Sequence, residues 1–206
     1  MSEQSSVHAY LNWTKQRIDE MDATLASLEA KADQVMAGSK TKAEQIIADL
    51  KQRRDEFQTK AKSQAQAGEA AMQASKAQLE SQWQVFEGQV KTYFDTVGEQ
   101  VERQQATFRE AAAAQAKAWQ EAAETFHSEA AKIAAARRVD FENAVKQMKA
   151  DGAEAEARLQ KLQQAASETW AALSTGLAES RKAFDRANQK ASDALKGIAP
   201  EKTTST

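Results

Sequence analysis

Large apolar residues recur mostly at steps of seven or eleven between residues 83 and 195, with chiefly alanine and polar residues between them. Each residue of an α-helix turns by about 100°, so either step returns to within about 20° of its starting direction. Because steps of seven fall short and steps of eleven overshoot, a mixture of the two cancels the drift. The pattern predicts an apolar stripe on one side of a long, nearly straight helix, formed by Trp83, Phe94, Val101, Phe108, Trp119, Phe126, Ile133, Phe141, Met148, Leu159, Leu173, Phe184 and Leu195.

A second apolar pattern occupies the first part of the chain, where the steps alternate between four and three. This spacing is that of a coiled-coil seam. Ser5 and Ser6 are suited to cap the start of such a helix through their hydroxyls. Tyr10 and Trp13 flank the seam and are expected to cover its edge. The predicted seam consists of Val7, Leu11, Ile18, Met21, Leu25, Leu28 and Val35, with Thr14 and Ala32 as its weak members.

Two places are predicted to interrupt the helices. Gly38 is suited to close the first helix, and Thr41 with Glu44 forms a capping box for the next. Asp151 and Gly152 form the second candidate turn, although the stripe keeps its phase across them. These breaks predict an elongated helical domain over residues 1–198 with helices at about 5–37, 41–150 and 153–198. A disordered tail is expected at 199–206, where Pro200 stops the helix.

Three further glycines lie inside the predicted central helix. Gly68 belongs to a stretch rich in Gln and Ala and costs about 1 kcal/mol relative to Ala in a helix interior, so this stretch is expected to be the least stable. Gly88 and Gly98 have two readings of equal weight. They mark the close approach of a neighbouring helix, or they are tolerated defects.

The predicted helices allow two all-α architectures. In the first, they fold back into an elongated antiparallel bundle whose central helix would be about 165 Å long. In the second, the chain stays extended and pairs with copies of itself. Both place the same stripes in helix–helix contact. Because these seams are longer than one chain obviously covers, we expect at least a dimer.

The composition agrees with long helices. The chain has 206 residues, of which 41% are hydrophobic, 6% aromatic and 28% charged, with seven glycines and one proline. Such a chain has few places to turn and is typical of coiled coils rather than of a thick globular core. The 28 basic and 30 acidic residues are well mixed and give a net charge of −2. No basic cluster suited to nucleic acid is present, so no nucleic-acid partner is predicted.

Other sequence features bear on location. The chain has no cysteine, which fits a reducing compartment. Residues 1–6 lack the charged and apolar regions of a signal peptide. No apolar run approaches the roughly 20 residues that cross a bilayer. We therefore expect a soluble, cytoplasmic protein.

Candidate catalytic and metal-binding chemistry is sparse. Glu124 and His127 lie three residues apart and would share one helix face, as metal ligands do in di-iron bundles. Such sites need two Glu-x-x-His pairs, and the remaining histidine, His8, has no glutamate three residues before it. Serines lack a strand-to-helix elbow, and no glycine-rich loop follows a strand. The sequence predicts no metal, no cofactor and no enzymatic activity.

The aromatic stripe has a second interpretation as a lipid-binding face, since interfacial helices pair an apolar face with basic flanks. The stripe is narrower than usual for a surface-bound helix, which favours helix–helix packing. The basic residues suited to flank it are Lys91, Arg103, Arg109, Lys117, Lys132 and Lys146.

From residue 7 to residue 198 the chain resembles two groups of amphipathic-helix proteins in composition. These are the apolipoprotein A/E-like proteins, which cover lipid, and the bacterial phasins, which coat storage-polymer granules. The resemblance implies a surface-coating function and transfers no particular site residue. The residues themselves favour a non-enzymatic structural or interaction protein that self-associates or packs against a helical partner. A coat on a lipid or storage-polymer surface is the alternative.

Overall fold

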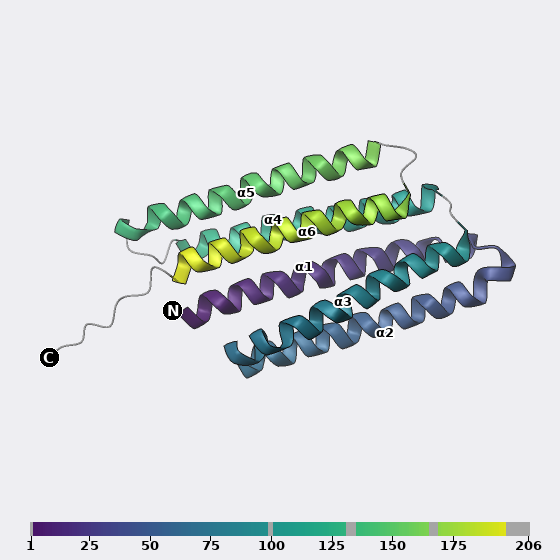
Figure 1. Cartoon of the computed structure of the whole chain (residues 1–206), viewed down its shortest axis with the longest axis horizontal. Helices are drawn as coiled ribbons and strands as arrows, with labels where there is room; N and C mark the ends of the chain where they lie inside the picture. The colour runs from purple at the N-terminus through teal and green to yellow at the C-terminus, as the bar shows by residue number, and fades with distance from the viewer. Residues whose placement is uncertain (1, 99–100, 131–134, 165–168, 197–206) are drawn as a thin grey trace.

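The structure, a computed structural model, describes residues 2–98, 101–130, 135–164 and 169–196. This part of the chain forms six α-helices and no strand (Figure 1). The predicted all-α class is therefore confirmed. The helices are α1 (Ser2–Ala30), α2 (Ala37–Ala67), α3 (Glu69–Val97), α4 (Val101–Ala130), α5 (Ala135–Gln164) and α6 (Trp170–Lys196), with a short 3-10 helix, η1 (Ala32–Gln34), between α1 and α2.

Consecutive helices run antiparallel, and the six helices form an elongated bundle (Figure 1). A helix of about 30 residues is about 45 Å long, which sets the length of the bundle. Helix α1 occupies the centre, where it contacts α2, α3, α4 and α6. Figure 1 shows α4, α5 and α6 on one side of α1 and α2 and α3 on the other. Every helix therefore has at least two neighbours from the same chain.

The predicted layout of three helices with one very long central helix is wrong. Gly68 ends α2 with φ 99°, and Gly98 ends α3 with φ 83°. Glycine adopts these positive φ values without the steric cost that a side chain brings. A periodic pattern reports which side of a helix is apolar, and it does not report whether the axis continues or folds back. The steps of seven and eleven therefore pass through the turns without a visible break.

The first predicted break is close to its true place, but its chemistry is different. Helix α1 already ends at Ala30, and the chain turns through η1 before Met36 precedes the first residue of α2. Gly38 lies in the first turn of α2, and Thr41 and Glu44 lie inside that helix, so they form no capping box. The prediction failed because a capping motif is local and the turn is set by packing of α1 against α2.

Gly152 is not a turn, because it lies inside α5. A Cβ atom at this position would come within 2.9 Å of Cε3 of Trp119 on α4. Gly176 on α6 similarly leaves space for Leu162 on α5. Both glycines allow close approach of neighbouring helices. The predicted C-terminal tail lies outside the described residues.

The apolar side chains gather in separate clusters. Helices α1, α2 and α3 enclose the largest one, which contains Phe57, Phe86 and Tyr93. Helices α4, α5 and α6 enclose two more, one around Phe126 and one around Leu177. We call α1–α3 the N-unit and α4–α6 the C-unit. Each unit has its own apolar core.

The helical glycines give a test of this packing. Replacing the exposed Gly88 by Ala should raise the free energy of unfolding by up to about 1 kcal/mol, since its Cβ would meet open space and Ala is the better helix former. Gly152→Ala makes the same chemical change but pushes against the Trp119 ring, so it should bring no gain or a loss. Guanidinium unfolding followed by circular dichroism measures both. An equal gain from the two variants would contradict the close approach of α5 to α4.

Candidate functional site: the polar interface between the two units

The interface between the two units is formed by α1 of the N-unit packing against α4 and α6 of the C-unit, with a smaller contact between α3 and α6. The apolar clusters stop on either side of it. Among the described residues, Trp170 is the side chain that packs against clusters of both units. Its ring lies 4.8 Å from that of Phe94, centroid to centroid. The other contacts across the interface described below are polar.

Glu20 of α1 lies at the centre of this interface and is fully buried. Its carboxylate accepts hydrogen bonds from Arg181 of α6, from Gln115 of α4 at 2.9 Å and from Gln16 of α1 at 2.9 Å. Arg181 also bonds to Glu87 of α3. Helices α1, α4 and α6 therefore meet at one carboxylate, and Arg181 links α3 to it through Glu87.

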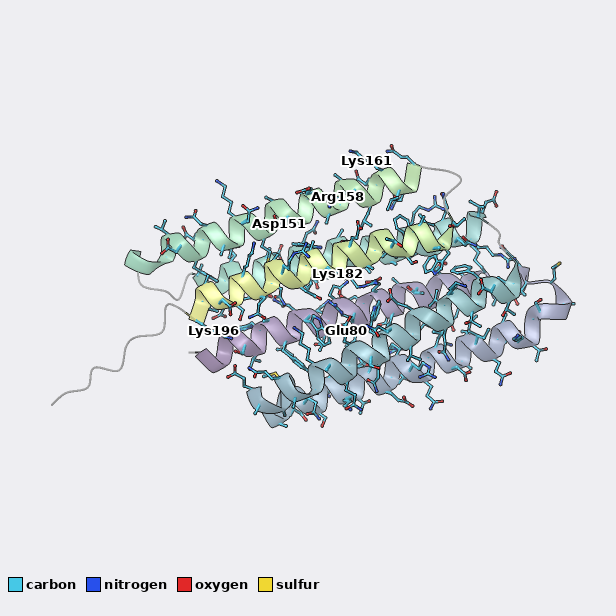
Figure 2. All side chains as sticks on the ribbon, in the orientation of Figure 1. Glu80, Asp151, Arg158, Lys161, Lys182 and Lys196 are labelled. Atoms are coloured by element: carbon cyan, nitrogen blue, oxygen red, sulfur yellow. The ribbon has the colours of Figure 1, made fainter. Side chains whose placement is uncertain are left out.

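Arg17 forms the second charged contact, one helical turn before Glu20. Its guanidinium donates two parallel hydrogen bonds to Asp185 of α6, at 2.7 and 2.8 Å. Glu80 of α3 lies 3.6 Å away on the other side. Figure 2, in which Glu80 marks α3 and Lys182 marks α6, shows α1 between these two helices. A bidentate arginine–carboxylate pair is among the strongest and most directional polar contacts in proteins.

Both arginines also cover tryptophan rings. The guanidinium of Arg17 lies 4.8 Å from the ring centroid of Trp13 in the same helix. That of Arg181 lies 4.7 Å from the ring centroid of Trp83 and so crosses from the C-unit to the N-unit. A cation over an indole face gains electrostatic stabilisation and shields the ring from water.

The polar contacts continue along α1 in both directions. Towards its N-terminus, Lys15 lies 2.6 Å from Glu121 of α4, and Asn188 of α6 donates to the carbonyl of Ala9 at 2.7 Å. Further contacts are Asn12 with Asn188, His8 with Glu129, Ser27 with Thr107, and Arg103 with the carbonyl of Gln34.

Burial of the carboxylate determines the titration of this interface. It raises the pKa of Glu20 above its ordinary value, and the nearby Arg181 and Gln115 offset only part of that rise. Burial acts to lower the pKa of Arg181, but Glu20 and Glu87 outweigh it and leave the pKa raised. The raised pKa of Glu20 favours its neutral form, and the raised pKa of Arg181 favours its charged form. Since arginine stays charged in proteins, Glu20 is the member of the pair that responds to pH.

The interface is not fully satisfied. Oε1 of Gln115 and Nε of Arg103 are buried and have no hydrogen-bond partner in the protein. Each such atom costs about 1–3 kcal/mol of desolvation. Buried ion pairs in turn recover little more than their desolvation cost against an apolar replacement. The interface therefore specifies how the units fit together but contributes less stability than the apolar cores.

Two hollows lie along the groove between α3 and α6. One of about 220 Å³ is lined by Tyr10, Trp13 and Met72 among others. The other, of about 360 Å³, is lined by Trp83, Phe86 and Trp170 among others. The Arg17–Asp185 pair and the Arg181–Glu87 pair cross this groove. The N-unit thus presents buried aromatic rings towards α6, and the packing between α3 and α6 leaves hollows beside them.

The residues of the predicted first seam divide between core and surface. Met21, Leu25, Leu28 and Val35 are buried in the N-unit core, with Val7 and Ile18 packed at its edge. Leu11, predicted in the same seam, is 44% exposed. Tyr10 and Trp13, expected to cover the edge, are buried in the core instead. The reason is that the central helix has neighbours on several sides, so its buried face is wider than one seam.

The residues of the predicted second stripe are divided among the three clusters. Val101 is 38% exposed, and Ile133 lies outside the described residues. Leu195 is partly buried against a C-unit cluster. The remaining stripe residues are buried: Trp83 and Phe94 in the N-unit, and Phe108, Trp119, Phe126, Phe141, Met148, Leu159, Leu173 and Phe184 in the C-unit.

The candidate metal pair does not form part of a larger group. Glu124 and His127 are both exposed on α4. Among the described residues, no group of three or more histidine, cysteine, aspartate or glutamate side chains is placed to hold a metal ion. Likewise, none of the described helices has the length and apolarity needed to cross a membrane.

The fold and the interface define an all-α antiparallel six-helix bundle made of two three-helix units over the described residues. Searches against family models, curated proteins and solved structures find no match to this chain.

The network residues were not identified from the sequence. Glu20, Arg181 and Gln115 look like ordinary polar positions on helix faces. One signal was present: Tyr10 and Trp13 lie off the predicted seam, and large aromatic residues on a second face indicate a helix that is buried on more than one side.

The raised pKa of Glu20 predicts a pH dependence of unusual sign. The folded protein holds this proton more tightly than the unfolded chain. The free energy of unfolding of the wild type relative to Glu20→Gln should therefore rise as the pH falls through the raised pKa, and level off below the ordinary value of 4.5. Guanidinium unfolding of both proteins across pH 4–8 measures the difference.

Glu121 provides the matched control on the same interface. Its hydrogen bond with Lys15 lowers its pKa. The free energy of unfolding of the wild type should exceed that of Glu121→Gln above the ordinary pKa. This difference should be lost as the pH falls through the lowered pKa. The same slope for both variants would contradict the assigned burial of Glu20.

Proposed function

We propose that this protein is a non-enzymatic coat that covers a lipid or storage-polymer surface with amphipathic helices. One observation carries the proposal. The apolar faces of six helices of similar length, 27 to 31 residues, meet inside a single chain in cores that belong to two separate units. A chain of this kind can exchange helix–helix contacts for contacts with an apolar surface while its helices persist.

The closed bundle itself offers little apolar surface. Its exposed large hydrophobic side chains among the described residues lie scattered on five different segments, and scattered single residues are ordinary on a protein surface. They are Leu11, Met36, Val85, Val101 and Val139. Contact with an apolar surface through the aromatic residues therefore requires the bundle to open.

The basic residues fit this reading in part. Lys91, Arg109, Lys117 and Lys146 are exposed and would flank the apolar faces of an opened chain. Arg103 is instead buried in the interface, where it donates to the carbonyl of Gln34. Lys132 lies outside the described residues. Exposed lysine and arginine beside an apolar face support binding at an interface with water.

Self-association stays the second prediction. It was expected because the seams seemed too long for one chain to cover. In the structure the described helices cover most of these residues within the chain, so this reason no longer applies. Light scattering across a concentration series decides the point, since a self-associating protein gains mass with concentration and a closed monomer does not.

Binding to an apolar surface is the direct test. The protein should float with a triolein emulsion stabilised by phosphatidylcholine, and its tryptophan fluorescence should be quenched by brominated lipid, because Trp13 and Trp83 leave their buried positions. The helical circular dichroism signal should persist in the bound state. Absence of flotation, or flotation without quenching, would contradict a coat that opens.

A surface variant separates opening from binding by the closed bundle. Met36 and Val139 are the most exposed large apolar residues, at 70% and 61%. The double variant Met36→Gln/Val139→Gln removes them without touching either core. Flotation should be unchanged in this variant. A loss of flotation would mean that the closed bundle binds through its outer surface.

A further inference from the structure

We infer that the bundle opens first between the N-unit and the C-unit, that the polar interface around Glu20 is the latch, and that α3 is the first apolar face uncovered. The order of opening follows from the contacts within the chain. The claim that this uncovered face then binds an apolar surface rests on the proposed function.

The apolar cores are divided between the two units. Separating the units keeps the buried members of each cluster together, because these members lie within one unit, and it removes Trp170 from the edge of the N-unit cluster. Removing a helix from within a unit would instead expose buried aromatic residues such as Phe57 or Phe141 to water. Apolar exposure is the dominant cost of unfolding, so the units separate at a lower cost than they unravel.

The chemistry of the interface is the second step. Arg17, Asp185 and Glu20 are solvated by water once the units part, which returns part of their desolvation cost. The buried atoms without partners, such as Oε1 of Gln115, also gain water. The interface therefore opens into a state that water stabilises, which a purely apolar interface does not.

The connection between the units is the third step. The chain passes between them once, from α3 to α4, and Gly98 ends α3 with a positive φ. The apolar contact that crosses the interface, between Trp170 and Phe94, lies at this end of the bundle. The opposite end is joined by polar contacts such as Asn188 with Ala9. A single connection lets the two units part along the length of the bundle.

The uncovered face is the fourth step. Arg181 of α6 lies over the ring of Trp83, and Trp170 of α6 lies against Phe94. Movement of α6 away from the N-unit removes both covers. The hollow of about 360 Å³ beside Trp83, Phe86 and Trp170 shows that packing between α3 and α6 is already incomplete there. Aromatic rings on α3 are therefore the first apolar groups that an opened chain presents.

Thiol labelling tests the order of opening without any lipid. The chain contains no cysteine, so a single introduced thiol reports on one site. Ser27→Cys and Thr107→Cys report on the interface, where the two hydroxyls lie 2.9 Å apart. Ser75→Cys reports on the N-unit core and Ala155→Cys on the C-unit core. Ser27, Ser75 and Ala155 have matched exposure, at 7%, 6% and 6%.

The expected result is a difference in rate. At the same fraction of each variant's own guanidinium midpoint, thiols at positions 27 and 107 should react with a disulfide reagent at least about tenfold faster than thiols at 75 and 155, because local openings differ in free energy across a fold. An equal reaction rate for the thiols at all four positions would overturn the inference. Fastest reaction at position 75 would do so as well, since the N-unit would then open first.

A reversible disulfide across the interface tests the latch and the coat together. In the double variant Ser27→Cys/Thr107→Cys, oxidation should join α1 to α4 and abolish flotation with the triolein emulsion, while reduction should restore it. Each single variant serves as the control. Equal flotation of the oxidised and reduced forms would overturn the latch and leave the coat standing. Absence of flotation in the wild type would overturn the coat, and the labelling rates would still decide the latch.

Discussion

The structure depends on the cost of burying one carboxylate. Glu20 lies on the central helix where water does not reach, and an uncompensated charge there would be far more costly than any single packing contact. Donors from α1, α4 and α6 therefore converge on it. Because Arg181 and Gln115 reach Glu20 only at one relative position of their helices, this requirement fixes the register of α4 and α6 against α1. Apolar contacts alone, which are non-directional, would tolerate other registers.

This arrangement distributes stability unevenly. Within each unit, rings such as Phe57 and Phe141 lose all contact with water, and the free energy gained is proportional to the apolar area that they bury. Between the units, hydrogen bonds and ion pairs replace equivalent contacts with water, so the net gain is small. A bundle built in this way has a strong preference for one closed geometry and a modest cost for leaving it. Specificity and stability are thus provided by different residues.

The sequence predicted the composition of the cores better than the path of the chain. Phe108, Phe126 and Phe184 recur at helical spacing, and helical spacing alone indicates that they share a side. The turn at Gly98 was not predicted, because a glycine that reverses the chain and one that is merely tolerated, such as Gly88, look alike in the sequence. The polar interface was not predicted either. Its residues become distinctive only when helices far apart in the sequence, such as α1 and α6, are placed side by side.

The same physical features bear on what the protein does. A bundle with one continuous apolar core would keep its aromatic residues from any external surface, since opening it would expose all of them to water at once. Here the aromatic residues are divided, and the contacts that join the two sets are ones that water can replace. Trp83 illustrates the consequence, because its cover in the closed form is the guanidinium of Arg181, a group that remains stable when solvated. The chain thus has a closed folded form that is compatible with water. Separation of the two units uncovers a face that an apolar surface would stabilise.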